Sequence, residues 1–592
     1  MNIYSLIRRY ASALALLTVL MGLFAAPYLI PENPDSEVFR TGTLGTLLML
    51  FCYFPVQQTL QKARARMLVS CMVLGWLFAA ALGIGSELLV YEGLLPGMGS
   101  MLRRIAVPFM AAPLLGTLAA RLMLLRESTH PLAGRTLNLP MWGYMLILIA
   151  CWTPLLLAFY PGMLNYDVLV EYGQFLGGWN DRHPMLYLVF TYFFYRLGIL
   201  FGQETLSMLA VSILRMVTFA AALAYACHFL QRRRVSAWIL VLMTAAFAFL
   251  PVYSVMSVST AKDTPFAAAL LVLSLLCWDA LEDPAAFFAS KRRKLALVLM
   301  IVLTWHMRKN GVAALAILPA VIIALRGYRL PMLRLSIIGV IASMLLAAGM
   351  DVILKPTAQP SFQLYSLPAQ QLVRAYNLGD LSPEDKAEIE SWYLDEYDFR
   401  LLPHLADGAK GYLKDDYLKD HSDEFMALWA RIGKQCPRIY AEAFLMLNQG
   451  LWYPDDLSHA RIYQDTHWVP MGYLQTNYYD LSANKIYSSS LLPGLAELVE
   501  RICAQNSYQK YPIISILFCT ATPLWIMLFS CAMLIANKKT RYTSVAMGVF
   551  GLTISYLFGP CTLPRYVLPT FCLAPVLLIL TLRQPCETHS AS

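Results

Sequence analysis

The feature that most constrains this chain of 592 residues is a series of apolar runs, most of them long enough to cross a lipid bilayer. A hydrocarbon core of about 30 Å requires about 20 helical residues. Such runs cover residues 11–30, 41–60, 67–91, 102–125, 141–160, 206–230, 236–258, 264–281, 294–306, 311–326, 333–353, 511–536, 543–559 and 566–583. Because only 14% of the residues are charged, against about a quarter in soluble domains, we expect an all-α polytopic membrane protein with about 14 transmembrane helices.

The net charge of +9 is unevenly distributed along the chain. Residues 355–510 carry 21 acidic and 14 basic residues, whereas the remainder holds 32 of the 46 basic and 16 of the 37 acidic residues. The two parts therefore have net charges of −7 and +16. Since the basic residues gather beside apolar runs, the sequence predicts the lipid bilayer as a partner and no nucleic acid.

Basic clusters follow every second predicted membrane boundary, and the positive-inside rule places them all in the cytoplasm. They are Arg8 and Arg9, Lys62 to Arg66, Arg121 and Arg126, Arg232 to Arg234, Lys291 to Lys294, Arg326 and Arg329, and Lys538 to Arg541. Both termini are then cytoplasmic, with the first helix retained rather than cleaved. Residues 184–202 would invert this order if they crossed, so we expect them to lie in or dip into the outer leaflet.

The composition divides the chain into four parts. Residues 1–140 form an N-terminal addition of four spans, and residues 141–353 form a transmembrane core with an external loop at 161–205. Residues 354–510 form a mainly α-helical extracytoplasmic domain, followed by C-terminal transmembrane helices at 511–592. In the extracytoplasmic domain Trp452, Tyr453, Trp468 and Tyr473 either pack a small core, which we favour for each, or stack on sugar rings.

No GxxxxGK[ST], GxGxxG, HExxH, CxxC or GxSxG motif occurs, so nucleotide hydrolysis, zinc peptidase and serine hydrolase activities lose their usual support. Polar residues gather instead at the outer ends of predicted helices. In residues 160–187, Asp167 begins a short helix with Glu171 one turn later on the same face, and Asp181 and His183 follow. Caps and interfacial polar residues are the alternative, but a functional role explains their grouping better.

Further polar residues lie at other outer helix ends. Lys262 and Asp263 begin a span, where a helix cap and a functional role are equally plausible. Arg308 and Lys309 lie outside, against the positive-inside trend, which suits an anionic ligand such as a lipid phosphate unless this loop is cytoplasmic. Arg565 is a further member of this set.

The external side lacks nucleotide sugars and ATP, so group transfer there commonly uses a lipid-linked donor. An enzyme for such a donor needs a carboxylate base, cations or a metal ion for the leaving phosphate, and an apolar groove. The chain offers these components.

The pattern resembles the GT-C superfamily, whose members are polytopic glycosyltransferases that use lipid-phosphate sugars on the outer or luminal face. The residues that carry the resemblance are Asp167 with HPMLY (183–187), and KDTP (262–265). The chain also resembles an uncharacterised bacterial membrane family, domain of unknown function 6020, from about residue 141 to 580. The stretches are YPGMLNYD, HPMLY, KDTPF, RKNG, SLPAQQLVRAY, LADGAKGYL and GLWYPDD. The paired acids usual in the GT-C loop are absent, since Tyr166 and Val168 flank Asp167.

The resemblance implies a GT-C-like fold in the bacterial cytoplasmic membrane. It implies a glycosyltransferase that moves a sugar from a polyprenyl-phosphate donor to an extracytoplasmic acceptor: a cell-wall glycan, a glycolipid or a protein. Asp167 would be the catalytic base. The substrate-binding residues would be Glu171, Asp181, His183, Arg215, Lys262, Asp263, Arg308, Lys309 and Arg565. Arg215 would pair with a carboxylate of the site or extend to the membrane surface.

No cofactor is firmly predicted. A divalent cation, Mg or Mn, is the candidate, and Asp181, His183 and Asp263 either bind it or orient substrate groups. The alternative functions are a transporter or flippase for a lipid-linked glycan and a scaffold without catalysis. A transporter predicts polar residues across the middle of the membrane and an internal repeat, and the sequence shows neither.

Overall fold

The computed structural model describes residues 3–29, 43–128, 137–164, 167–454, 481–503, 516–517 and 519–582. These residues form helices and no sheet, with only isolated β-bridges between loops. The prediction of an all-α polytopic membrane protein is therefore confirmed for this part of the chain.

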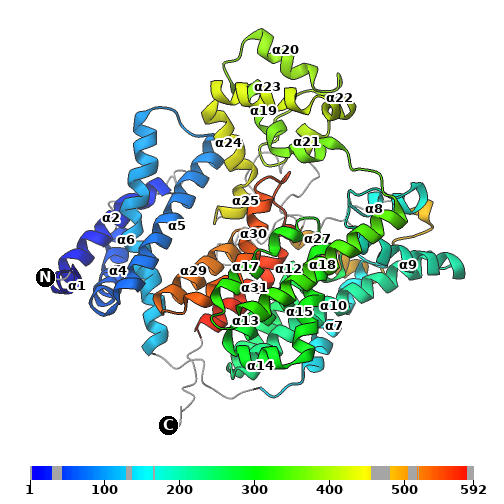
Figure 1. Cartoon of the computed structure of the whole chain (residues 1–592). Helices are drawn as coiled ribbons and strands as arrows, with labels where there is room; N and C mark the ends of the chain where they lie inside the picture. The colour runs from blue at the N-terminus through cyan, green and yellow to red at the C-terminus, as the bar shows by residue number, and fades with distance from the viewer. Residues whose placement is uncertain are drawn as a thin grey trace.

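The N-terminal helices pack together at one side of the molecule (Figure 1). They are α1 (Ile3–Arg9), α2 (Ala11–Leu29), α4 (Thr43–Lys62), α5 (Ala65–Tyr91) and α6 (Met98–Ser128). Helices α5 and α6 approach closely because glycines meet at their contact. A Cβ added to Gly75 would lie 2.7 Å from the backbone nitrogen of Gly116. Small residues at such contacts let membrane helices pack tightly.

The remaining transmembrane bundle is built around α13 (Asp263–Glu282), which is buried along almost its whole length. Helix α13 contacts α10 (Glu204–Arg232), α15 (Lys291–His306) and α31 (Pro564–Leu582). The other bundle helices are α7 (Met141–Ala158), α9 (Met185–Phe201), α11 (Ala237–Phe249), α12 (Pro251–Val258), α16 (Gly311–Ala314), α17 (Ile317–Ala324), α18 (Arg329–Leu354), α29 (Thr522–Ala536), η4 (Thr540–Ala546) and α30 (Met547–Tyr556). Since α13 begins at Asp263, the centre of the bundle carries a polar group at one end.

Eight described helices are long and apolar enough to cross a membrane: α2, α5, α6, α7, α10, α13, α18 and α31. The count becomes nine if α11 and α12, which are bent by 50° at Leu250, form one broken span. Most of the other predicted crossings correspond to shorter or broken helices, such as α16 with α17. Helix α15 has 16 residues, of which the first four are basic, so its apolar part is short. The segment 184–202 contains α9, whose 17 residues are also too few for this set. The number fourteen stays a prediction.

The part of the polar insert between Ala369 and Tyr440 folds around its own core, which includes Leu372, Tyr393, Phe425 and Ile432. Its elements are η1 (Ser361–Tyr365), α19 (Ser366–Leu378), α20 (Pro383–Ser391), α21 (Asp407–Lys410), α22 (Asp415–Asp420), α23 (Ser422–Gln435), α24 (Pro437–Leu447), α25 (Gln449–Trp452), η2 (Ser482–Asn484) and α27 (Pro493–Cys503). Aromatic side chains such as Tyr393 and Phe425 thus pack this core. Of the four aromatic residues singled out from the sequence, Trp452 packs against the core of the bundle instead. Tyr453 is buried against Gly85, whereas Trp468 and Tyr473 lie outside the described residues.

Buried polar contacts attach the insert to the N-terminal helices. Arg374 and Glu442 form a buried ion pair at 2.9 Å, and the Glu442 carboxylate accepts a hydrogen bond from the Leu94 backbone N–H at 3.1 Å. Leu94 lies in the connection between α5 and α6. The Gln449 side chain donates a hydrogen bond to the Gly85 carbonyl oxygen at 2.8 Å. The Ala406 N–H also donates a hydrogen bond to the carbonyl oxygen of Pro560, between α30 and α31, at 2.7 Å, so the insert rests on both the N-terminal helices and the bundle.

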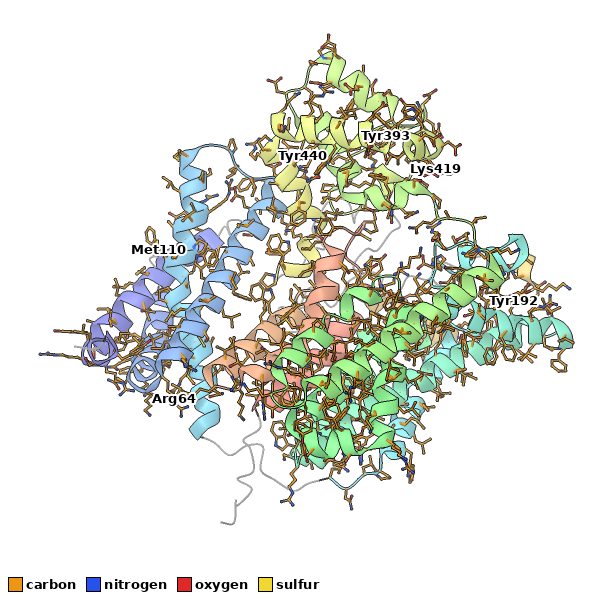
Figure 2. All side chains as sticks on the ribbon, viewed as in Figure 1. Arg64, Met110, Tyr192, Tyr393, Lys419 and Tyr440 are labelled. Carbon is orange, nitrogen blue, oxygen red and sulfur yellow. The ribbon has the colours of Figure 1, made fainter. Side chains whose placement is uncertain are left out.

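The insert and the basic clusters lie at opposite ends of the molecule. Tyr393 and Tyr440 mark the insert end in Figure 2, and Arg64 marks the other. Helix α14 (Pro284–Ala289) also lies at that other end (Figure 1), immediately before Lys291–Lys294. Arg233 is held there by ion pairs with Asp279 and Glu282. This separation of charge is the arrangement that the positive-inside rule describes.

Candidate functional site

Two loops at the insert end of the bundle lie side by side and carry Asp167 and Lys262. The Met163 N–H donates to the Val258 carbonyl oxygen, and the Thr260 N–H donates to the Met163 carbonyl oxygen, both at 2.9 Å. Soon after these contacts, α8 (Asp167–Gly177) begins at Asp167 and α13 begins just after Lys262. A carboxylate in the first turn of a helix is favoured by the helix dipole. The paired loops therefore bring two helix starts and their charged residues together.

The Asp167 carboxylate is held by two cations from distant segments. Its Oδ2 atom accepts hydrogen bonds from Lys262 Nζ at 2.8 Å and from Arg565 Nη1 at 2.6 Å. Arg565 lies in the first turn of α31. Burial acts to raise the pKa of Asp167, but Arg565 and Lys262 outweigh it, so this pKa lies well below its ordinary value. Asp167 is therefore ionised at neutral pH.

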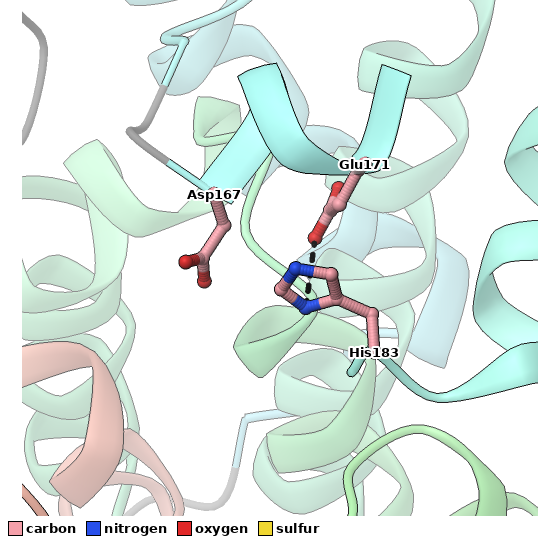
Figure 3. Close-up of side chains that lie close together, drawn as sticks. All are labelled: Asp167, Glu171 and His183. Atoms are coloured by element: carbon pink, nitrogen blue, oxygen red, sulfur yellow. Dashed lines mark ion pairs between the residues drawn. The ribbon is translucent and has the colours of Figure 1, made fainter. Parts of the chain in front are cut away.

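His183 and Glu171 complete a compact group with Asp167 (Figure 3). His183 Nδ1 lies 2.9 Å from Lys262 Nζ and 4.0 Å from Glu171 Oε1. Burial, reinforced by the Lys262 charge, lowers the pKa of His183 to about 2. Its ring is therefore neutral, and because Nδ1 accepts from the ammonium, the ring proton is on Nε2.

The two carboxyl groups of α8 are shifted in opposite directions. Burial raises the pKa of Glu171. The Lys262 charge lowers this pKa by a smaller amount, so Glu171 is more readily protonated than an ordinary glutamate. Asp167, one turn away, is shifted downward. Neighbouring carboxyl groups with such divergent pKa values are typical of sites that handle protons.

Asp263 forms a second ionic centre beside the first. Its side chain is fully buried and pairs with the Arg308 guanidinium, while Arg565 Nη1 lies 3.6 Å from its Oδ2. Both arginines lie over the ring of Tyr566, with guanidinium-to-centroid distances of 4.4 Å for Arg308 and 5.0 Å for Arg565. Arg565 therefore bridges Asp167 and Asp263, and an aromatic ring supports both guanidinium groups.

Arg215 reaches the site through a tyrosine. Its guanidinium donates hydrogen bonds to the Tyr187 hydroxyl at 2.6 Å and to the Thr260 carbonyl oxygen at 2.7 Å. The Tyr187 hydroxyl in turn lies 3.0 Å from Glu171 Oε2 and donates to it. Arg215 is 4% exposed, so it does not extend to a membrane surface.

Asp181 and Lys309 lie at the rim rather than in the buried group. Their side chains are 46% and 39% exposed, and Lys309 Nζ is 3.6 Å from Asp181 Oδ2. The Gln359 backbone N–H donates to Asp181 Oδ1 at 2.5 Å, and the Gln359 side chain accepts from Lys309 at 3.1 Å. These two predicted residues thus fix the start of the insert beside the site.

Tyr187, Tyr566 and Thr260 were not identified from the sequence as members of the site. Tyr187 is the last residue of HPMLY, and Tyr566 follows Arg565. Their positions next to predicted site residues were the only feature of the sequence that could have identified them. An apolar neighbourhood made packing the simpler interpretation of both tyrosines.

Asp167, Glu171 and His183 are of the residue types that bind divalent cations, and their ligand atoms lie within 4.8 Å of one another. The space between them is filled, however, by the Lys262 ammonium, at 2.8 Å from Asp167 and 3.8 Å from Glu171. In this arrangement the three residues do not fit a metal ion.

Comparison with known proteins shows similarity to one family. The match, to a family of unknown function (DUF6020), covers residues 178–592. No curated protein and no solved structure matches the chain. The match starts later than residue 141, where the sequence resemblance was expected to begin. It therefore omits Asp167 and Glu171, and it includes His183, Arg215, Lys262, Asp263, Arg308 and Arg565. Because it covers more than two thirds of the chain, the chain belongs to the DUF6020 family.

Proposed function

We propose that the chain is a membrane glycosyltransferase of GT-C type. It transfers a sugar from a polyprenyl-phosphate donor to an extracytoplasmic acceptor, which is a cell-wall glycan, a glycolipid or a protein. The active site lies at the insert end, on the outer face of the bacterial cytoplasmic membrane, and both termini are cytoplasmic. We also propose that the whole chain crosses the membrane fourteen times, as the sequence predicts.

The observation that carries the proposal is the charge balance of the buried site. Among the residues that the structure describes, four cationic side chains, Arg215, Lys262, Arg308 and Arg565, are grouped with three carboxyl groups, those of Asp167, Glu171 and Asp263. Within this described group the excess is one positive charge, and it becomes two when Glu171 is protonated, the form that its raised pKa favours. A buried excess of positive charge is costly unless an anion neutralises it. A phosphodiester supplies that anion, and guanidinium groups bind it with two parallel hydrogen bonds.

The proposed chemical step uses Asp167 as the base. Its carboxylate takes the proton from an acceptor hydroxyl while the acceptor oxygen forms a bond to the anomeric carbon of the donor sugar. The bond from that carbon to the phosphate oxygen breaks, and the polyprenyl phosphate leaves with the electron pair. Arg308 and Arg565 stabilise the charge that develops on the leaving phosphate.

The ion pairs of Asp167 also suit this step. Lys262 and Arg565 now stabilise the negative charge of Asp167, which makes it a weak base. A donor phosphate that draws Arg565 away would raise the pKa of Asp167 and strengthen the base. Donor binding would thereby make Asp167 a stronger base toward the acceptor hydroxyl. Without a bound donor, Asp167 would remain a weak base.

A donor screen with the purified protein tests the proposal. Polyprenyl-phosphate sugars are supplied with extracted envelope acceptors, and transfer is compared between wild type and Asp167→Asn. Transfer by wild type that falls strongly in the variant supports the assignment, and equal transfer by both removes Asp167 as the base.

The competing function is transport of a lipid-linked glycan, which needs ionisable groups along a path across the membrane. The ionic group described here lies at one end of the bundle. Flipping of a labelled lipid-linked glycan in proteoliposomes, without any sugar transfer, would favour transport.

A further inference from the structure

The Lys262 ammonium occupies the centre of a group that has the composition of a metal site. Its Nζ atom lies 2.8 Å from Asp167 Oδ2, 2.9 Å from His183 Nδ1 and 3.8 Å from Glu171 Oε1. The three ligand residues come from α8 and the loop before α9, whereas Lys262 enters from the start of α13. A cation belonging to the chain thus stands where an exogenous cation would otherwise bind.

The expected spacing of the ligand atoms differs between a metal ion and an ammonium. Ligands placed tetrahedrally around an ion lie about 1.6 times the ion–ligand distance apart, which is about 3.4 Å for a metal bound at about 2.1 Å. For an ammonium that donates hydrogen bonds of about 2.8 Å, the same geometry gives about 4.6 Å. His183 Nδ1 and Glu171 Oε1 are 4.0 Å apart, and the three ligand atoms lie within 4.8 Å of one another. The 4.0 Å separation lies between these two values, so the occupant is decided by Lys262 itself, whose Nζ atom makes contacts of hydrogen-bond length with Asp167 Oδ2 at 2.8 Å and His183 Nδ1 at 2.9 Å.

We propose that Lys262 is the resident cation of the Asp167–Glu171–His183 group and that the native protein takes no metal ion there. The ammonium fixes the Asp167 carboxylate and the His183 ring, a task that a divalent cation performs in other sites of this composition. Lys262 is then a positioning residue, and the cation cannot be removed by a chelator. This inference goes beyond the proposed transfer reaction, because ion occupancy is measured without any sugar donor.

The first test is metal binding by the full-length wild type in detergent, after treatment with a chelator. Manganese(II) is added to wild type and to His183→Ala, and bound ion is followed by electron paramagnetic resonance. We expect the same number of bound ions per chain in both proteins. One manganese ion bound per chain by wild type and lost in His183→Ala would overturn the proposal.

The second test replaces the cation. Lys262→Ala is expected to melt several degrees below wild type, and propylammonium chloride is expected to restore at least half of that loss. Wild type in propylammonium chloride, and the variant in sodium chloride of equal ionic strength, are the controls and should not change. Restoration by manganese(II) but not by propylammonium would contradict an ammonium site. If Lys262→Ala does not fold, the first test still decides, because it needs no Lys262 variant.

Discussion

Arg565 Nη1 lies 2.6 Å from Asp167 Oδ2, so the first turn of the last described helix closes onto the first turn of α8. The two residues are separated by 398 positions. Asp167 precedes the residues matched to the family, and Arg565 lies within them. The candidate site therefore depends on contact between segments from opposite ends of the bundle sequence.

Replacing Asp167 by Asn should remove the base while preserving the size of the side chain. We expect transfer to fall about 10²–10⁴-fold, the usual contribution of a general base. Sugar transfer measured at saturating donor checks this. Asp395→Asn is the matched control, because its side chain is fully exposed in the insert and should leave activity unchanged. Comparable losses in the two variants would argue against a specific role for Asp167.

Replacing Arg565 by Gln should destabilise the protein and weaken donor binding. It leaves the buried Asp167 and Asp263 carboxylates with one cation fewer, and breaking a buried pair in this way costs about 3–5 kcal/mol. The free energy of unfolding in mixed micelles and the KM for the donor are the measurements.

Arg501→Gln supplies the control for Arg565→Gln, since Arg501 pairs with Glu497 on α27 and both side chains are exposed, at 61% and 71%. Exposed pairs contribute about 0–1 kcal/mol. If both variants lowered the free energy of unfolding by the same small amount, the ion pairs of Arg565 would not stabilise the protein more than an exposed pair does.

His183 should make stability depend on acidic pH. Its pKa is about 2 in the folded protein, below the ordinary value of 6.5, so the unfolded chain binds the proton more readily between these values. Stability is then fully present above about pH 6.5 and is lost as the pH falls, by about 2 kcal/mol at pH 5. Thermal unfolding of wild type and His183→Gln from pH 7 to pH 5 checks this. The variant should show a shallower dependence, and identical slopes would refute the prediction.

Replacing Tyr187 by Phe should uncouple Arg215 from Glu171. The change removes the hydroxyl that accepts from Arg215 and donates to Glu171, and leaves both buried groups short of a partner. We expect a loss of about 1–3 kcal/mol. Tyr412→Phe is the control, because Tyr412 is 40% exposed in the insert. An unchanged melting temperature for Tyr187→Phe would show that this link adds little.

The sequence could predict the helices and several members of the site, because both depend on short-range pattern. Apolar run length locates the spans, and helical spacing puts Asp167 and Glu171 on one face of α8. The two tyrosines were missed because a buried tyrosine in an apolar segment has the same pattern as one that packs.

The partners of each charge could not be predicted in this way. A helix such as α13 is apolar on all sides, so its pattern does not define which face meets which neighbour. Asp181 and Lys309 were grouped with the buried residues, but the loop that carries Asp181 turns toward Thr357 and Gln359, which leaves both at the rim. Such loop paths follow from tertiary contacts rather than from residue spacing.

The orientation of the bundle gives a final prediction, because the two ends of the molecule differ in charge. Alkaline phosphatase, which is active only outside the cytoplasm, should be active when fused after Phe175 in α8 and inactive when fused after Arg233. Phe175 lies on the same helix as Asp167, whereas Arg233 lies at the basic end, near α14. The positive-inside rule gives this direction, since Arg232 to Arg234 and Lys291 to Lys294 would resist translocation. Activity after Arg233 but not after Phe175 would reverse the orientation and place the Asp167 site in the cytoplasm. A lipid-phosphate donor would then lose its rationale, because nucleotide sugars are available on that side.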